Sequence, residues 1–271
     1  MHLLVLTDFS PAADHALAYA DALAAQLGAG LILLHVQRTS PLDPDALTGA
    51  LSPLSEGEIA AALAQRSSRL SVPVLTEATP ARVPEAAQAA VQRHAPALVV
   101  LGRPASAAAS PEVVAHTTAL ALLGSIGCPL LLVPEHAPLV VPPHQLAIAA
   151  DNKPFSFSEA TASAVGWLNA LPASIFILHV AEPEDNDSAA VAYQHVLASG
   201  LLPATREVHQ HGVRHLSMAD GVMQGAQEVN AELLVVQVRH HSWLGNLFHH
   251  SVTMRLVQRT HLPILLLPVV G

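Results

Sequence analysis

The chain has 271 residues, of which 51% are hydrophobic and 12% are charged, so it holds ample material for a core and is not a disordered protein. Aromatic residues make up 3% and the formal net charge is −9. These values argue against the stacking platforms and basic grooves that bind nucleic acids, and against attraction to an anionic membrane surface. We therefore expect neither nucleic acid nor a membrane as a partner.

The first half alternates continuous apolar runs with stretches of helical period, which indicates parallel strands buried on both faces and helices that cover them. Ser10 followed by Pro11 is typical of a helix start. Cys128 is the single cysteine, which excludes an intrachain disulfide, and we interpret it as an inert core residue. The predicted strands lie near 3–7, 30–36, 72–76, 97–101 and 129–134, and the helices near 11–27, 55–70, 82–93 and 112–124.

The second half repeats these elements in the same order. Asp8 follows the first apolar run, and Asp151 follows its counterpart; His35 in the second run matches His179. The predicted strands lie near 145–150, 174–180, 204–209, 232–238 and 263–268, and the helices near 157–171, 187–199, 217–229 and 249–260. We predict two tandem α/β domains, each a doubly wound five-stranded parallel sheet: domain one over residues 1–138 and domain two over residues 144–271.

The apolar final strands of the two domains are the natural docking edges, so we expect self-association through domain–domain packing or a homodimer. The longest stretch without a formal charge, residues 113–134, is broken by Gly127 and Pro129, which predicts a helix and a strand rather than a membrane span. The N-terminus lacks a basic region and reaches Asp8 too early for a secretory leader. These features predict a soluble protein of the reducing cytoplasm.

Three motifs carry a resemblance to a known family. They are Thr7-Asp8-Phe9-Ser10 after the first strand, Leu34-His35-Val36 on the second, and the run from Cys128 to Pro134, each with a counterpart in domain two. The ordered set resembles the universal stress protein domain, present twice, with a fold similar to that of adenine-nucleotide α-hydrolases. The resemblance implies the strand order 3-2-1-4-5, a role in the stress response, and a ligand site at the switch point between strands one and four.

The resemblance also implies which residues would meet a nucleotide. ATP-binding members have an Asp after strand one, an apolar residue ending strand two, and a Gly-x2-Gly-x9-Gly-Ser/Thr loop whose backbone N–H groups approach phosphates. In domain one the matching residues are Asp8, Val36, Gly102 and Thr117, without the middle glycine. In domain two they are Asp151, Val180 and Ser251, with Gln237, His240 and His250 in place of the three glycines. ATP is therefore expected in domain one only, if it is bound at all.

Several of these residues have a second interpretation. Asp8 and Asp151 could instead cap the helices that follow them. Four histidines of one loop could hold a transition metal, although they lack the spacing of a zinc motif and could equally be polar loop residues: His240, His241, His249 and His250. Apolar residues near the domain-two switch point could form a lid over a degenerate pocket, or a surface for a hydrophobic ligand or partner: Phe155, Phe157, Trp243, Leu244, Leu247 and Phe248.

The sequence contains no catalytic constellation, and neither a nucleophile elbow nor a Walker motif is present. Three functions remain open. The first is a non-enzymatic stress-response protein whose tandem domains form a pseudo-dimer. The second is an ATP-binding protein with one working site in domain one, and the third is a metal-binding protein that uses the histidine-rich loop.

Overall fold

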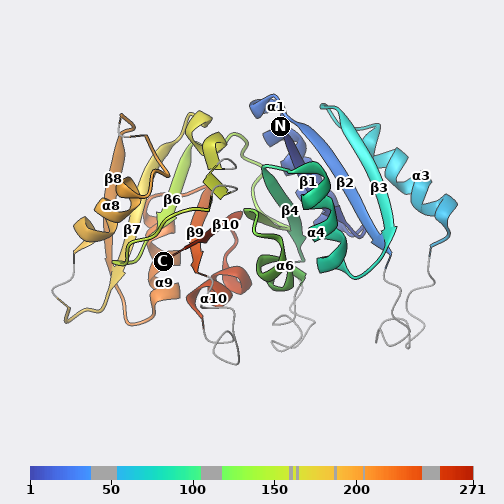
Figure 1. Ribbon diagram of the computed structural model, residues 1–271. Coiled ribbons are helices and arrows are strands. Elements are labelled where there is room, and N and C mark those ends of the chain that lie inside the picture. Colours follow the sequence, from blue (N-terminus) through green and yellow to red (C-terminus); the bar gives the residue numbers. More distant parts are fainter. Residues whose placement is uncertain are drawn as a thin grey trace.

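The computed structural model describes residues 1–37, 54–104, 118–158, 161–162, 165–185, 188–203, 205–239 and 251–270. Within these residues the two halves repeat one arrangement of strands and helices and lie side by side (Figure 1). None of the helices in this part of the chain has both the length and the apolar character needed to cross a bilayer.

The elements of each half follow the predicted alternation of strand and helix. In domain one they are β1 (His2–Thr7), α1 (Pro11–Leu27), β2 (Gly30–Gln37), α3 (Glu56–Ser67), β3 (Val74–Pro80), α4 (Val83–His94), β4 (Leu98–Arg103), α6 (Thr118–Ile126) and β5 (Leu130–Pro134). In domain two they are β6 (Gln145–Ala149), the 3₁₀ helix η1 (Gly166–Ala170), β7 (Ser174–Ala181), α8 (Ala189–Ala198), β8 (Val208–Arg214), α9 (Met218–Glu228), β9 (Leu233–Arg239), α10 (Val252–Arg259) and β10 (Ile264–Val269).

The two five-stranded sheets join into one ten-stranded sheet of order β3-β2-β1-β4-β5-β10-β9-β6-β7-β8. Each half has the predicted order 3-2-1-4-5 with parallel neighbours, which confirms the doubly wound fold. The final strands β5 and β10 pair antiparallel, with Leu131 opposite Leu265. The predicted docking edges are therefore used within the chain, and the halves are arranged as a pseudo-dimer.

Apolar layers cover both faces of this sheet, as the right-handed crossovers of a parallel sheet require. One layer joins the strands to α1, α3, η1 and α8, and it contains Leu23, Leu63 and Trp167. The other joins them to α4, α6, α9 and α10, and it contains Leu122 and Leu256. Both layers include residues of the two halves, so the core continues across the antiparallel β5–β10 junction.

Three predicted elements differ from the structure. The prediction of one α-helix over 157–171 is wrong. Residues 166–170 form the 3₁₀ helix η1 instead, and this helix begins at Gly166, a poor α-helix former. The third strands, predicted near 72–76 and 204–209, lie at 74–80 and 208–214. Both are edge strands with exposed polar side chains, which protect the edge from pairing with another chain. Because such strands are not continuously apolar, hydropathy does not locate them.

The burial of Cys128, two residues before β5, supports its interpretation as a core residue. Its thiol donates to the Pro96 carbonyl at 3.4 Å, and burial raises the pKa of Cys128 to about 12. The raised pKa means that the neutral thiol stabilises the fold below its unfolded pKa, and that this contribution is lost as the pH rises through the folded value. We expect iodoacetamide to leave Cys128 unmodified at pH 8 and to alkylate it in denaturant, as mass spectrometry would record. Rapid alkylation of the native protein would contradict this burial.

Candidate functional site

The predicted site residues of domain one meet at the carboxyl ends of β1, β2 and β4. Asp8, Val36 and Gly102 line one cavity there, together with Leu34 and Val83. Its volume is about 60 Å³, which is room for several water molecules and far below the ~300–1,000 Å³ of typical ligand pockets. Thr117, the fourth predicted residue, lies outside the described residues.

The Asp8 carboxylate shapes the turn that leads into α1. Its Oδ1 accepts a hydrogen bond from the Ser10 backbone N–H at 3.0 Å. The N-cap of α1 is Ser10, whose side chain accepts from the Ala13 N–H at 3.2 Å. The interpretation of Asp8 as the helix cap is therefore wrong, while the predicted Ser10–Pro11 helix start is confirmed. Asp8 orders the turn before the helix and lines the cavity at the same time.

A histidine near the end of β2 is hydrogen-bonded to the last residue of β1, and domain two repeats this contact. The His35 Nδ1–H donates to the Thr7 carbonyl at 2.9 Å, and the His179 Nδ1–H donates to the Ala150 carbonyl at 3.1 Å in domain two. Both histidines are buried. The Phe9 ring stacks on His35 with ring centroids 4.2 Å apart. The two equivalent histidines are thus structural, because each is bonded to the backbone carbonyl just before the switch-point aspartate of its domain.

Gly102 is needed for packing as well as for the cavity wall. A Cβ at this position would lie 2.8 Å from the Ala13 nitrogen and closer still to the Ala12 carbonyl. These are backbone atoms of the first turn of α1, and they cannot rotate away. The glycine therefore permits the close approach of β4 and α1, which explains its presence without any phosphate.

An arginine that sequence reasoning did not identify lies at the domain-two switch point. Arg239, at the end of β9, donates to the Asp151 carboxylate at 3.0 Å and to the carbonyls of Lys153 and Pro154 at 3.1 and 3.0 Å. Asp151 also accepts from the Lys153 N–H at 3.1 Å. The guanidinium therefore crosses from β9 to the turn after β6 and compensates the charge of Asp151.

The other predicted residues of domain two are held by local packing. Val180 is buried and meets the α9 backbone at Gly221, where an added Cβ would lie 2.5 Å from the valine Cγ1. Ser251 is the N-cap of α10, with its Oγ accepting from the Met254 N–H at 3.1 Å. Gln237 occupies the position of Gly102 and has a buried Nε2 without a hydrogen-bond partner. Val180 and Ser251 therefore each have a local structural role.

The metal and lid interpretations fall mainly on residues that are not described. His240, His241, His249 and His250 lie outside the described residues, as do Trp243, Leu244, Leu247 and Phe248. In the described part of the chain, no group of three or more His, Cys, Asp and Glu side chains is arranged to hold a metal ion. Phe155 is buried and meets Phe157 edge-on at 5.6 Å, so this pair belongs to the core.

A second arginine, Arg103, joins the switch point of domain one to domain two. It follows Gly102, and its Nη1 donates to the Gln258 carbonyl at 2.8 Å, while Nη2 donates to the Thr260 carbonyl. Both carbonyls belong to the last turn and cap of α10, where the helix dipole favours a cation. Burial lowers the pKa of Arg103, and its Nε has no hydrogen-bond partner. The corresponding residue of domain two is the buried Val238, so this contact occurs once.

Comparisons with known proteins agree with this architecture. A universal stress protein from Archaeoglobus fulgidus is 17% identical, with 98% of each chain covered and a TM-score of 0.68. A functionally unknown protein from Pseudomonas aeruginosa is 14% identical over 98% of this chain and 92% of that one, with a TM-score of 0.57.

The same fold also occurs in a different setting. The cytoplasmic domain of a prokaryotic cation chloride cotransporter is 11% identical over 98% of this chain and 94% of that one, with a TM-score of 0.54. No functionally curated protein matches the sequence. At these identities the likeness concerns the fold alone, and the fold does not determine the activity.

The family itself is determined by the sequence. The model of the universal stress protein family matches residues 1–134 and again residues 144–268. The two matches span almost the whole chain and coincide with the two halves of the ten-stranded sheet. The chain therefore belongs to the universal stress protein family and carries two of its domains in tandem.

Proposed function

We propose that this protein is a non-enzymatic universal stress protein in which only domain one keeps a ligand-binding switch point, while domain two is its structural partner. The observation that carries the proposal is the contrast between the two aspartates. Asp8 lines a cavity, whereas Asp151 is paired with Arg239. The domain boundaries near residues 138 and 144 form part of this proposal. The single buried, unpaired Cys128 fits a reducing compartment, so we also propose that the protein acts in the cytoplasm.

ATP is the alternative ligand for domain one, and we propose that it binds weakly at best. The cavity is small, and the packing of Gly102 against α1 already accounts for the glycine. Losing one backbone donor to a phosphate costs roughly 1.5–3 kcal/mol, which is about one to two decades in affinity. The small cavity and the missing donor together argue against tight binding of a nucleoside triphosphate.

The proposal predicts how the two switch points respond to substitution. In calorimetric titrations of the full chain with ATP, we expect weak binding, which Asp8→Ala removes and which the matched Asp151→Ala leaves unchanged. The reason is that Asp151 is already neutralised by Arg239. Micromolar binding that survives Asp8→Ala, or binding lost only in Asp151→Ala, would contradict the assignment. ATP turnover that depends on Asp8 would contradict the non-enzymatic part.

A further inference from the structure

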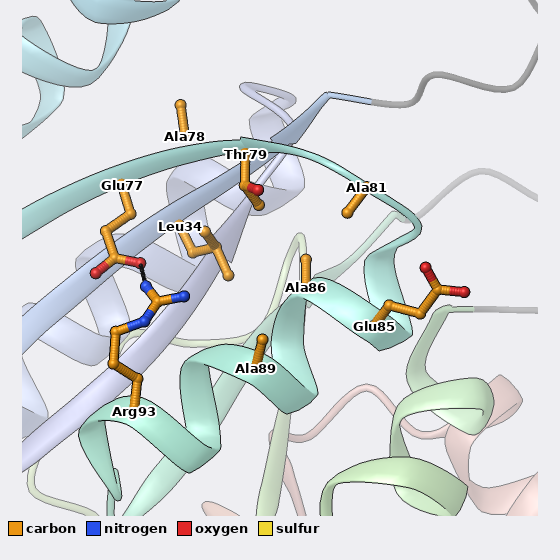
Figure 2. A pocket seen from close by; sticks show the side chains of 9 residues that line it. All are labelled: Leu34, Glu77, Ala78, Thr79, Ala81, Glu85, Ala86, Ala89 and Arg93. Carbon is orange, nitrogen blue, oxygen red and sulfur yellow. Dashed lines mark hydrogen bonds and ion pairs between the residues drawn. The ribbon is translucent and has the colours of Figure 1, made fainter.

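The two faces of β2 in domain one meet different helices. Leu34 packs against α4 and borders a hollow between β3 and α4, where Figure 2 shows Arg93 paired with Glu77. The next residue, His35, lies on the opposite face, because successive side chains of a strand alternate. The helices α1 and α3 cover that opposite face, and the turn that contains Asp8 lies beside it.

The residue after Asp8 is held by its ring and by its backbone. The Phe9 ring stacks on His35 with the ring centroids 4.2 Å apart. The Arg66 guanidinium also lies over the Phe9 ring, with its Cζ 4.7 Å from the ring centroid. In addition, the Phe9 N–H donates to the Thr7 Oγ1 at 3.1 Å. Phe9 is therefore fixed between the end of β1 and the helix α3.

Phe9 has a backbone conformation that residues with a Cβ seldom adopt. Its φ is +66°, in the left-handed region. Such a conformation persists only where the surrounding structure holds it. Arg66 supplies that support, because its Nη2 donates to the Phe9 carbonyl at 3.2 Å while the guanidinium covers the ring. A change of φ at Phe9 would separate the ring or the carbonyl from Arg66.

Arg66 is itself anchored on the first turn of α1. Its Nε donates to the Asp14 Oδ1 at 2.5 Å and its Nη2 to the Asp14 Oδ2 at 3.0 Å, and 17% of the arginine side chain is exposed. This two-point contact fixes the plane of the guanidinium. None of these contacts uses Asp8. In the described part of the chain, the Asp8 carboxylate accepts only from the Ser10 N–H.

Domain two has its arginine at a different position. The bonds that end α3 and α8 align Arg66 with Leu197, which cannot donate a hydrogen bond. The registers of β4 and β9 align Pro104 with Arg239. Arg239 binds the carboxylate of Asp151 directly. Each half therefore has one arginine at its aspartate turn, but only in domain one does that arginine hold the backbone and leave the aspartate unpaired.

We propose that Arg66 is a positioning residue of the domain-one switch point. It holds Phe9 in the left-handed conformation and so keeps the turn that the Asp8–Ser10 bond closes. Because Arg66 does this without binding the Asp8 carboxylate, that carboxylate stays accessible to a ligand at the cavity. This inference rests on the proposed role of domain one as the ligand-binding half.

The first test uses no ligand. Three-bond backbone couplings of Phe9, measured by nuclear magnetic resonance on the full chain, report the sign of φ. We expect a positive φ in the native protein and its loss in Arg66→Leu, which introduces the domain-two residue. The matched control is Arg69→Leu, which replaces an exposed arginine just after α3 and should keep the positive φ. A positive φ that survives in Arg66→Leu would overturn the proposal, even if the melting temperature falls, because Arg66 would then only stabilise the fold.

The second test is calorimetric titration of the same variants with ATP. Arg66→Leu should weaken the binding that depends on Asp8 by about tenfold, since the ligand must then restore a strained turn. The double variant with Phe9→Gly should regain affinity, because glycine adopts a positive φ without support. Native affinity in Arg66→Leu would overturn the proposal. If the native protein does not bind ATP while Arg66→Leu loses the positive φ, the ligand-binding role fails and the positioning role of Arg66 stands.

Discussion

Gly102→Ala is expected to lower the free energy of unfolding by about 3 kcal/mol. The added methyl group would overlap the backbone of Ala12 and Ala13. That backbone is held by the Ser10 cap and by Pro11 at the start of α1, so it has little freedom to shift. Urea unfolding followed by far-ultraviolet circular dichroism would measure the loss.

Gly57→Ala is the control for this substitution. Gly57 lies in the first turn of α3, and an added Cβ there meets no atom within 4 Å. Alanine is the better helix former, so this variant should be as stable as the native protein or more stable, by up to about 1 kcal/mol. If Gly102→Ala and the native protein unfold at the same urea concentration, β4 and α1 do not approach as closely as described.

Arg103→Met is expected to cost about 2 kcal/mol and to separate the unfolding of the two domains. The substitution removes both donors from the Gln258 and Thr260 carbonyls while keeping an apolar stem of similar length. Both tryptophans, Trp167 and Trp243, belong to domain two, so tryptophan fluorescence follows that domain while circular dichroism follows both. The two signals should coincide in the native protein and diverge in the variant.

Arg103→Lys provides a graded control. Lysine keeps the positive charge near the end of α10 but lacks the planar fork that reaches two carbonyls at once. We expect its effect to lie between those of the native residue and methionine. A single shared transition at the native midpoint in Arg103→Met would mean that this contact does not couple the domains.

The repeat of apolar runs was sufficient to predict two parallel α/β domains, whereas the strand order 3-2-1-4-5 came from the family resemblance. A parallel strand buried on both faces must be continuously apolar, and runs such as Leu3–Leu6 and Leu31–Leu34 have no other plausible place than a sheet core. The edge strands β3 and β8 were displaced in the prediction, because each has solvent on one side and carries polar residues such as Glu77 and His211. Local patterns also missed the change to 3₁₀ geometry at η1, which ends just before Pro172.

The candidate site could be predicted only in part, for a different reason. Asp8 and Gly102 follow strands that the sequence identifies, so their meeting at one edge of the sheet follows from the topology. The contacts of Arg103 and Arg239 do not follow from the topology. Arg239 contacts Asp151 from 88 residues away, and Arg103 reaches Gln258 across 155 residues. Such contacts depend on the three-dimensional path of the chain, and no local spacing encodes them.

The single Arg103 contact has a consequence for how such a protein can evolve. In a homodimer with twofold symmetry every interface residue appears twice, so any substitution must suit both copies of the surface. Here both surfaces belong to one chain, and an arginine on one side is matched by Val238 on the other. A tandem chain is thus free of the requirement for self-complementarity. Each face can specialise for the other, and the two halves cease to be interchangeable.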